Sequence, residues 1–135
     1  MSQTEEIPRT VPGVELFFGE SVAQYLAEIS EEAYSAESSA EGFLLGKRFT
    51  DSQGEYAVVS GVTQDVAKAG QTVGWFRSSE SGNVVTPGDL SKIYSLFGYS
   101  RVYVIIIDSS AESMAMYVAE NGVARKVKSV MVENL

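Results

Sequence analysis

The polar segment that follows the apolar run Val-Gly-Trp-Phe, residues 73–76, contains the side chains best suited to chemistry. Its candidate residues are Arg77, Ser78, Ser79, Thr86 and Asp89. Serine hydroxyls are typical nucleophiles, and an aspartate is a typical metal ligand or proton acceptor. The segment therefore raises two questions, whether the chain carries a serine-dependent hydrolytic site and whether it carries a metal site.

The absence of two residue types limits both kinds of site. The 135-residue chain contains neither histidine nor cysteine, which removes the usual zinc ligands and both the Ser-His-Asp and the Cys-His arrangements. A serine nucleophile would need a lysine base such as Lys92, and nothing in the sequence places that lysine beside a serine. We therefore expect no catalytic residue, no bound metal and no cofactor.

Each candidate residue also has an ordinary structural interpretation. Thr86 and Asp89 fit a helix N-cap and its N3 position around Pro87. Trp75 ends an apolar strand pattern and suits a core position. Arg77 is either a solvated surface residue or the partner of a carboxylate, with Asp89, Glu41 and Glu80 as candidates.

Periodicity and turn signals predict one α+β domain with a mixed sheet and two main helices. We expect residues 1–13 to be a flexible lead-in and residues 14–135 to form the domain. The expected helices span 21–35 and 87–97, and the expected strands span 42–49, 56–62, 72–76, 101–108, 114–119 and 123–132. Residues 102–107 are continuously apolar, which is typical of a strand buried on both faces. Asn121-Gly122 predicts a tight hairpin turn.

Three stretches carry a resemblance to a known family. Gly-Phe-Leu-Leu-Gly at 42–46, Val-Gly-Trp-Phe at 73–76 and Thr86-x-x-Asp89 occur in the order found in the JAB/MPN family. Active members of that family are JAMM zinc isopeptidases. The resemblance covers residues 16–132 and implies a cytidine-deaminase-like α+β domain, with a mixed sheet flanked by two main helices.

The chain departs from the active family at its metal ligands. The family motif is an upstream Glu, then His-x-His, then Ser-x-x-Asp. Arg77 and Ser79 stand at the two His positions, Ser39 stands at the Glu position with Glu41 nearby, and Thr86 replaces the Ser. Only Asp89 is retained. The resemblance thus implies a degenerate, vestigial cleft formed by Ser39, Glu41, Arg77, Ser78, Ser79, Thr86 and Asp89.

Two functions follow from this interpretation. The first is a non-catalytic interaction or scaffold domain with a protein partner or a second copy of itself. The alternative is a module that binds a small molecule or peptide in the vacated cleft. An enzyme with an unfamiliar, metal-free mechanism is a third hypothesis.

Charge and hydropathy narrow the partners and the location. The formal net charge of −8 disfavours nucleic acid and anionic membranes. No apolar stretch is long enough to span a bilayer, and the N-terminal residues lack the apolar region of a secretory signal, so we expect a cytoplasmic protein. The acidic cluster Glu28, Glu31, Glu32 and Glu37 suggests a solvated helix face. The basic run Arg125-Lys126-Lys128 is either a protective sheet edge or a contact for an acidic partner.

Overall fold

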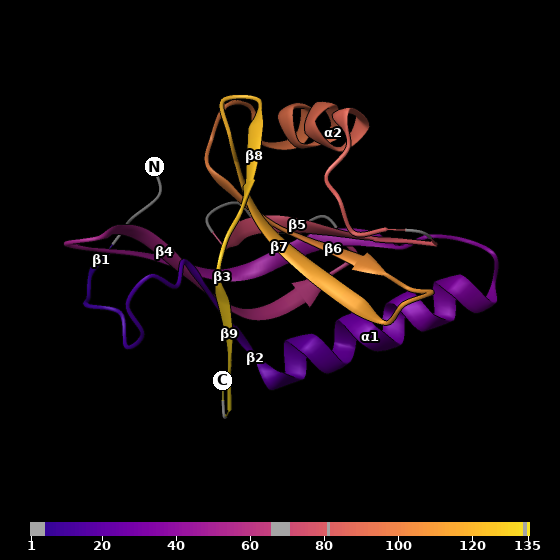
Figure 1. The fold of residues 1–135 in the computed structure, drawn as a ribbon, viewed down its shortest axis with the longest axis horizontal. Helices are drawn as coiled ribbons and strands as arrows, with labels where there is room; N and C mark the ends of the chain where they lie inside the picture. Colours follow the sequence, from indigo (N-terminus) through magenta and orange to yellow (C-terminus); the bar gives the residue numbers. More distant parts are fainter. Residues whose placement is uncertain (1–4, 66–70, 81, 134) are drawn as a thin grey trace.

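The protein has an α+β fold built on one curled, mixed β-sheet with two helices (Figure 1). The computed structural model describes residues 5–65, 71–80, 82–133 and 135. In chain order the elements are β1 (Glu5–Glu6), β2 (Leu16–Gly19), α1 (Glu20–Ser35), β3 (Glu41–Asp51), β4 (Gly54–Thr63), β5 (Thr72–Ser79), α2 (Pro87–Phe97), β6 (Val102–Asp108), β7 (Ser113–Glu120), β8 (Val123–Lys126) and β9 (Ser129–Val132).

The strand order explains the curl of the sheet. The order is β8-β7-β6-β5-β3-β4-β2-β9, and β1 pairs with β3 outside this path. β8 and β9 stand at the two ends of the order, yet only residues 127–128 separate them along the chain. One continuous segment therefore reaches both ends of the sheet, which holds the ends near each other. Figure 1 shows this segment in yellow, running from β8 to β9.

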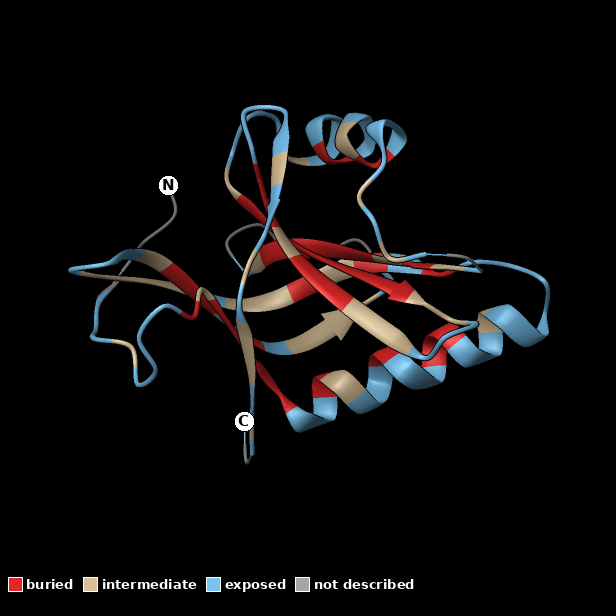
Figure 2. Cartoon of the chain, viewed as in Figure 1, coloured by how far each residue is buried: buried red, intermediate tan, exposed pale blue. Residues whose placement is uncertain are grey.

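Strand β6 contributes to two hydrophobic clusters by simple alternation. Its odd-numbered side chains Tyr103, Ile105 and Ile107 belong to the cluster that includes Leu26 of α1. Its even-numbered side chains at 102, 104 and 106 belong to a second cluster with Ile93 of α2. Because successive side chains of a strand point to opposite faces, both faces of β6 are covered. The prediction of a buried strand at 102–107 is confirmed, as the red bands in Figure 2 show.

Most helices and strands that the sequence indicates through periodicity, caps or turn residues lie where they are predicted. Both helices agree to within one residue, and β3 and β4 pair antiparallel as a hairpin. The β7–β8 turn has positive φ angles at Asn121 and Gly122, as a two-residue hairpin turn requires. Neither helix in the described part of the chain has the length and apolar composition needed to cross a bilayer.

The two ends of the chain differ from the sequence prediction. The expected single strand at 123–132 is wrong, because this segment divides into β8, which pairs with β7, and β9, which pairs with β2. The sequence carries no signal that predicts the strand β2. This strand has only four residues, and its partners β4 and β9 are both parallel and far away in the sequence, so no local turn announces the pairing.

The segment before β2 makes specific contacts with the β3–β4 hairpin. Arg9 donates two side-chain hydrogen bonds to Asp51, at 2.7 and 2.8 Å, and its backbone N–H donates a third at 3.0 Å. The Arg9 guanidinium also donates to the carbonyl oxygen of Val14 and lies over the ring of Tyr56. Residues 1–4 of the expected lead-in lie outside the described residues, and its flexibility stays a prediction.

Candidate functional site

Strand β5 positions the first group of candidate residues. The sequence places the end of this strand at Phe76, but the strand continues to Ser79, so Arg77, Ser78 and Ser79 lie on a strand and not in a loop. Arg77 is opposite Glu41 of β3 and opposite Ile106 of β6 in the backbone register. Two neighbouring strands thus supply hydrogen-bond partners to the backbone, and this pairing outweighs the low strand preference that the polar side chains suggest.

The start of helix α2 positions the second group. Thr86 is the N-cap, and its hydroxyl oxygen accepts a hydrogen bond from the Asp89 N–H at 3.1 Å. The Asp89 carboxylate accepts one in return from the Thr86 N–H at 2.8 Å. This reciprocal pair is the capping box that the sequence predicts, and it holds the Asp89 side chain at the first turn of the helix.

Arg77 and Asp89 form a two-pronged ion pair between strand and helix. Arg77 Nε donates to one carboxylate oxygen of Asp89 at 2.5 Å, and Arg77 Nη2 donates to the other at 2.8 Å. Arg77 Nη2 also donates to the carbonyl oxygen of Val84 at 3.3 Å. The expected approach of the Arg77 guanidinium to a neighbouring carboxylate is confirmed, and Asp89 is that carboxylate. We call this pair the Arg77–Asp89 centre.

Both charged side chains of the Arg77–Asp89 centre are largely buried, so their protonation states affect the stability of the fold. The Asp89 side chain is only 7 % exposed, and that of Arg77 is 19 % exposed. Burial by itself raises the pKa of Asp89, but the hydrogen bonds from Arg77 and Thr86 stabilise the carboxylate and hold its pKa below the ordinary value. Asp89 is therefore ionised at neutral pH, with a permanent positive charge in direct contact.

The remaining candidate residues have other partners. Ser78 is buried, and its Oγ accepts a hydrogen bond from the Ala40 N–H while its own N–H donates to the Ala40 carbonyl oxygen, both at 2.8 Å. Glu41 lies beside Arg77 in the sheet, but its carboxylate pairs with Lys92 of α2 at 3.1 Å. Ser39 is exposed. The backbone carbonyl oxygen of Ser79 accepts a hydrogen bond from the Ser109 N–H.

These contacts bring all seven candidate residues to one region, at the end of β5. The backbone hydrogen bonds between Ser78 and Ala40 place residues 39–41 beside residues 77–79, and the Arg77–Asp89 centre adds the start of α2. Glu80, the third carboxylate considered for Arg77, is exposed. The residues converge, but the side chains of Arg77, Ser78 and Asp89 are engaged with one another or with backbone groups.

The chemistry of these side chains does not fit a zinc ion. A catalytic zinc needs three protein ligands and an open position. Here both carboxylate oxygens of Asp89 accept hydrogen bonds from the Arg77 guanidinium. A dication next to Arg77 would also be repelled. Within residues 5–65, 71–80, 82–133 and 135, no three carboxylates gather as a metal site would require.

The structure contains a second charged cluster that no sequence pattern predicts. Arg101, just before β6, contacts Glu15 at 3.2 Å and Glu55 at 2.9 Å, and Arg125 of β8 contacts Glu15 at 2.9 Å. These residues are separated by 24 to 110 positions in the sequence, and no spacing motif connects them. The cluster joins the segment before β2 to β8, near the two ends of the curled sheet, and it indicates a structural role.

Comparison with known proteins gives information on the fold alone. No family model and no curated protein matches the sequence. Sixty-one chains of solved structures match the fold. One is the solution structure of protein DSY2949 from Desulfitobacterium hafniense, with a TM-score of 0.57 and 13 % sequence identity, covering 89 % of this chain and 94 % of that chain. The fold is therefore shared across nearly the whole length of both chains.

Proposed function

We propose that the protein is a non-catalytic, MPN-like interaction or scaffold domain that has lost the zinc site of its active relatives. The observation that carries the proposal is the Arg77–Asp89 centre. The resemblance assigns Arg77 to a metal-ligand position and Asp89 to another, and the two side chains meet at hydrogen-bond distance. The guanidinium then supplies the positive charge that a metal ion would otherwise supply to Asp89.

The order of elements and two close backbone approaches support the same proposal. The order after β2 is a helix, a hairpin, a strand, a second helix, a buried strand and a hairpin, which is the order on which the resemblance rests, and the additional strand β9 follows. A Cβ atom on Gly46 would lie 2.0 Å from the Val58 carbonyl oxygen, and one on Gly74 would lie 1.9 Å from that of Tyr103. Gly46 and Gly74, which lie in the stretches that resemble the family, are therefore required by the close approach of neighbouring strands. This approach is a property of the fold.

Restoring the lost ligands tests the proposed family geometry. We expect the double variant Arg77→His/Ser79→His to bind one equivalent of zinc through the new imidazoles and Asp89, measured by isothermal titration and by elemental analysis after dialysis. The matched control is Arg77→Ala/Ser79→Ala, which removes the same side chains without adding ligands. A folded His variant that binds no more zinc than the control would contradict the MPN-like assignment.

The interaction role has a separate test. We expect the tagged protein, purified from its source lysate under gentle conditions, to elute at a mass above that of one chain and to carry either a second copy or a stoichiometric protein partner. A monodisperse monomer with no co-purifying protein would refute the scaffold function. The proposed cytoplasmic location predicts recovery from the cytoplasmic fraction.

The alternative, a binding module in the vacated cleft, receives less support from these contacts. Its polar lining would be Arg77, Ser78, Ser79 and Asp89, and each of these residues has a partner within the chain. A thermal-shift screen with acidic metabolites and C-terminal peptides tests it directly, because a ligand of this cleft should lose its effect in Arg77→Ala. The first proposal is favoured unless such a ligand is found.

A further inference from the structure

A two-walled groove lies between the C-terminal half of α1 and the segment that connects β6 to β7. Its volume is ≈ 640 Å³, within the usual range of about 300–1,000 Å³ for ligand pockets. One wall is formed by residues 27–35 of α1, and the other by residues 107–114. The Ser109 hydroxyl donates a hydrogen bond to the Ser30 carbonyl oxygen at 3.4 Å, which connects the two walls.

The lining combines apolar surface with one carboxylate on each wall. Ala27, Ile107 and Met114 provide the apolar part. Glu31 comes from α1, and Glu112 comes from the β6–β7 connection. Both carboxylates are exposed, and no described basic side chain forms an ion pair with either of them.

Among the described residues, the charged side chains that line this groove, Glu31 and Glu112, are both acidic. The last turn of α1 contains no basic residue, although the C-terminus of a helix carries a partial negative charge that Lys or Arg would normally offset. The whole chain adds a net charge of −8. The exposed ring of Tyr34 also lines the groove, and an aromatic face attracts cations.

We propose that this groove binds a lysine or arginine side chain within an extended segment of a partner protein. Such a side chain has an aliphatic stem and a charged head, which match the apolar part of the groove and the two carboxylates. Met114 suits this role because methionine adapts its shape to different side chains. The inference rests on the proposed interaction function and names the chemistry of the partner.

The length of the groove favours a peptide over a small free amine. The wall on α1 extends from Ala27 to Ser35, which at 1.5 Å per residue is about 12 Å along the helix. An extended chain rises about 3.3 Å per residue, so roughly four residues of a peptide span this distance. A single ammonium ion would fill only a small part of it.

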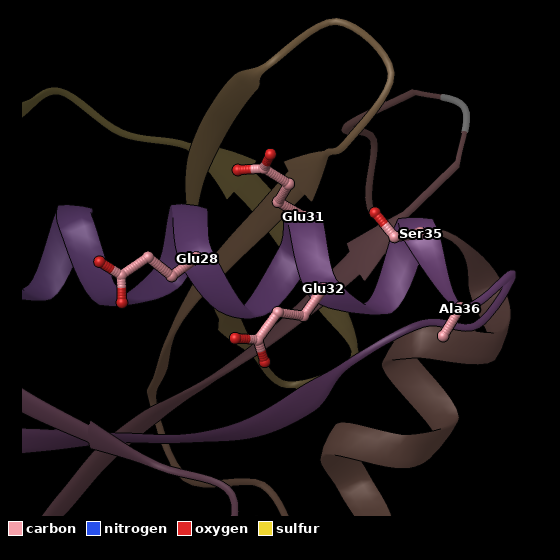
Figure 3. Close-up of a pocket in the computed structure, with 5 residues that line it drawn as sticks. All are labelled: Glu28, Glu31, Glu32, Ser35 and Ala36. Atoms are coloured by element: carbon pink, nitrogen blue, oxygen red, sulfur yellow. The ribbon is translucent and has the colours of Figure 1, made fainter.

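A neighbouring hollow on α1 shows that acidity alone does not define the groove. It is lined by Glu28, Glu31, Glu32, Ser35 and Ala36 (Figure 3). All five residues belong to α1 or follow it directly, so this hollow has no second wall. In Figure 3, Glu31 lies on one edge of the helix and Glu32 on the other. Glu28 and Glu32 line this hollow without lining the two-walled groove, and therefore provide a matched control.

Fluorescence anisotropy with a defined probe tests the proposal on the purified full chain. The probe is a fluorescein-labelled peptide of sequence Gly-Ser-Arg-Leu-Lys-Ser-Gly, and its control carries citrulline and norleucine in place of Arg and Lys. We expect binding of the charged peptide at about 0.15 M salt, where distant charges are largely screened. The neutral peptide should bind at least about tenfold more weakly, which corresponds to the loss of one or two charge-assisted hydrogen bonds.

Three variants separate the groove from a general acidic surface. Glu31→Gln/Glu112→Gln should weaken binding by about tenfold, whereas Glu28→Gln/Glu32→Gln, which removes the same charge, should weaken it by less than about threefold. Ala27→Trp leaves the charge unchanged and should also weaken binding, because it fills the groove from an exposed helix position. Circular dichroism tests whether each variant is folded. If Ala27→Trp does not fold, the comparison of the two Gln double variants decides whether the groove is the binding site.

Two results would overturn the proposal. Equal losses in the two Gln double variants would mean that the peptide recognises only the acidic face of α1. Absence of binding to the wild-type protein would exclude the groove as a site for basic segments. Neither result bears on zinc binding by the His variant or on co-purification of a partner, so failure of the groove and failure of the proposed function are distinguishable.

Discussion

Removal of Arg77 tests whether the Arg77–Asp89 centre stabilises the fold through charge. In Arg77→Met the aliphatic part of the side chain is largely kept, but Asp89 loses two charge-assisted hydrogen bonds, at 2.5 and 2.8 Å. Hydrogen bonds to charged groups contribute about 1.5–3 kcal/mol each, and breaking a buried ion pair costs about 3–5 kcal/mol. Arg77 is partly exposed and the Thr86 N–H remains bound to Asp89. We therefore expect a loss of about 2–3 kcal/mol in the free energy of unfolding at pH 7.

The pH dependence of this loss identifies its cause. In the wild type the folded-state pKa of Asp89 is lowered, so its contribution to stability is complete above the unfolded-state pKa, at about pH 4, and is lost as the pH falls through the folded-state pKa. In the variant, the lowering effect of Arg77 is lost while burial and the Thr86 hydrogen bonds remain, so the folded-state pKa of Asp89 is higher than in the wild type. The destabilisation is then complete above that higher pKa and is relieved as the pH falls through it. The difference between the two proteins should therefore shrink on acidification.

Urea unfolding followed by circular dichroism measures both effects, because urea, unlike guanidinium, does not screen ion pairs. The matched control is Lys92→Met, which removes the ion pair between Lys92 and Glu41 on the same helix. Both of those side chains are about half exposed, so the expected loss is below about 1 kcal/mol. A loss for Arg77→Met that is no larger than the control, or that stays constant from pH 7 to pH 3, would refute the ion-pair explanation.

Three further predictions concern the frame around the site. Arg9→Ala should detach the segment before β2 from Asp51 and increase proteolysis in that segment by more than tenfold, in an assay that leaves the β-sheet core intact. Gly74→Ala should destabilise the fold by more than about 3 kcal/mol in urea, because its Cβ would lie 1.9 Å from a backbone carbonyl oxygen that cannot move away. Burial, followed by the nearby Glu55 carboxylate, raises the pKa of Tyr103 to about 12. Its contribution to stability should be complete below about pH 10 and lost as the pH rises toward 12, and Tyr103→Phe should remove one late-titrating phenol from the absorbance at 295 nm.

Sequence by itself determines the elements that are specified by neighbouring residues. The start of α2 follows from Thr86, Pro87 and Asp89, whose capping interactions all lie within four positions. The β7–β8 turn follows from Asn121-Gly122, since these residues tolerate the positive φ angles that the turn needs. The absence of histidine is also a property of the sequence alone, and it limits the chemistry before any contact is known.

Pairings between distant segments are decided only in the tertiary structure. The extension of β5 through Arg77 to Ser79 depends on hydrogen bonds to β3 and β6, which offset the polar character of the segment. The strands β2 and β9 stabilise each other across more than 110 residues, and the groove between α1 and residues 107–114 exists only because two separate elements meet.

The carboxylate that pairs with Arg77 is likewise decided only in the tertiary structure. The sequence names Asp89, Glu41 and Glu80 as carboxylates for Arg77, but it does not rank them by position in space. In the fold, Glu41 is directly opposite Arg77 in the sheet and nevertheless pairs with Lys92, whereas Asp89 is 12 positions away and forms the two-pronged contact. The physical reason is the orientation of the Asp89 side chain, because the capping box fixes its carboxylate toward β5. Local sequence patterns do not encode the relative orientation of a strand and the helix that follows it.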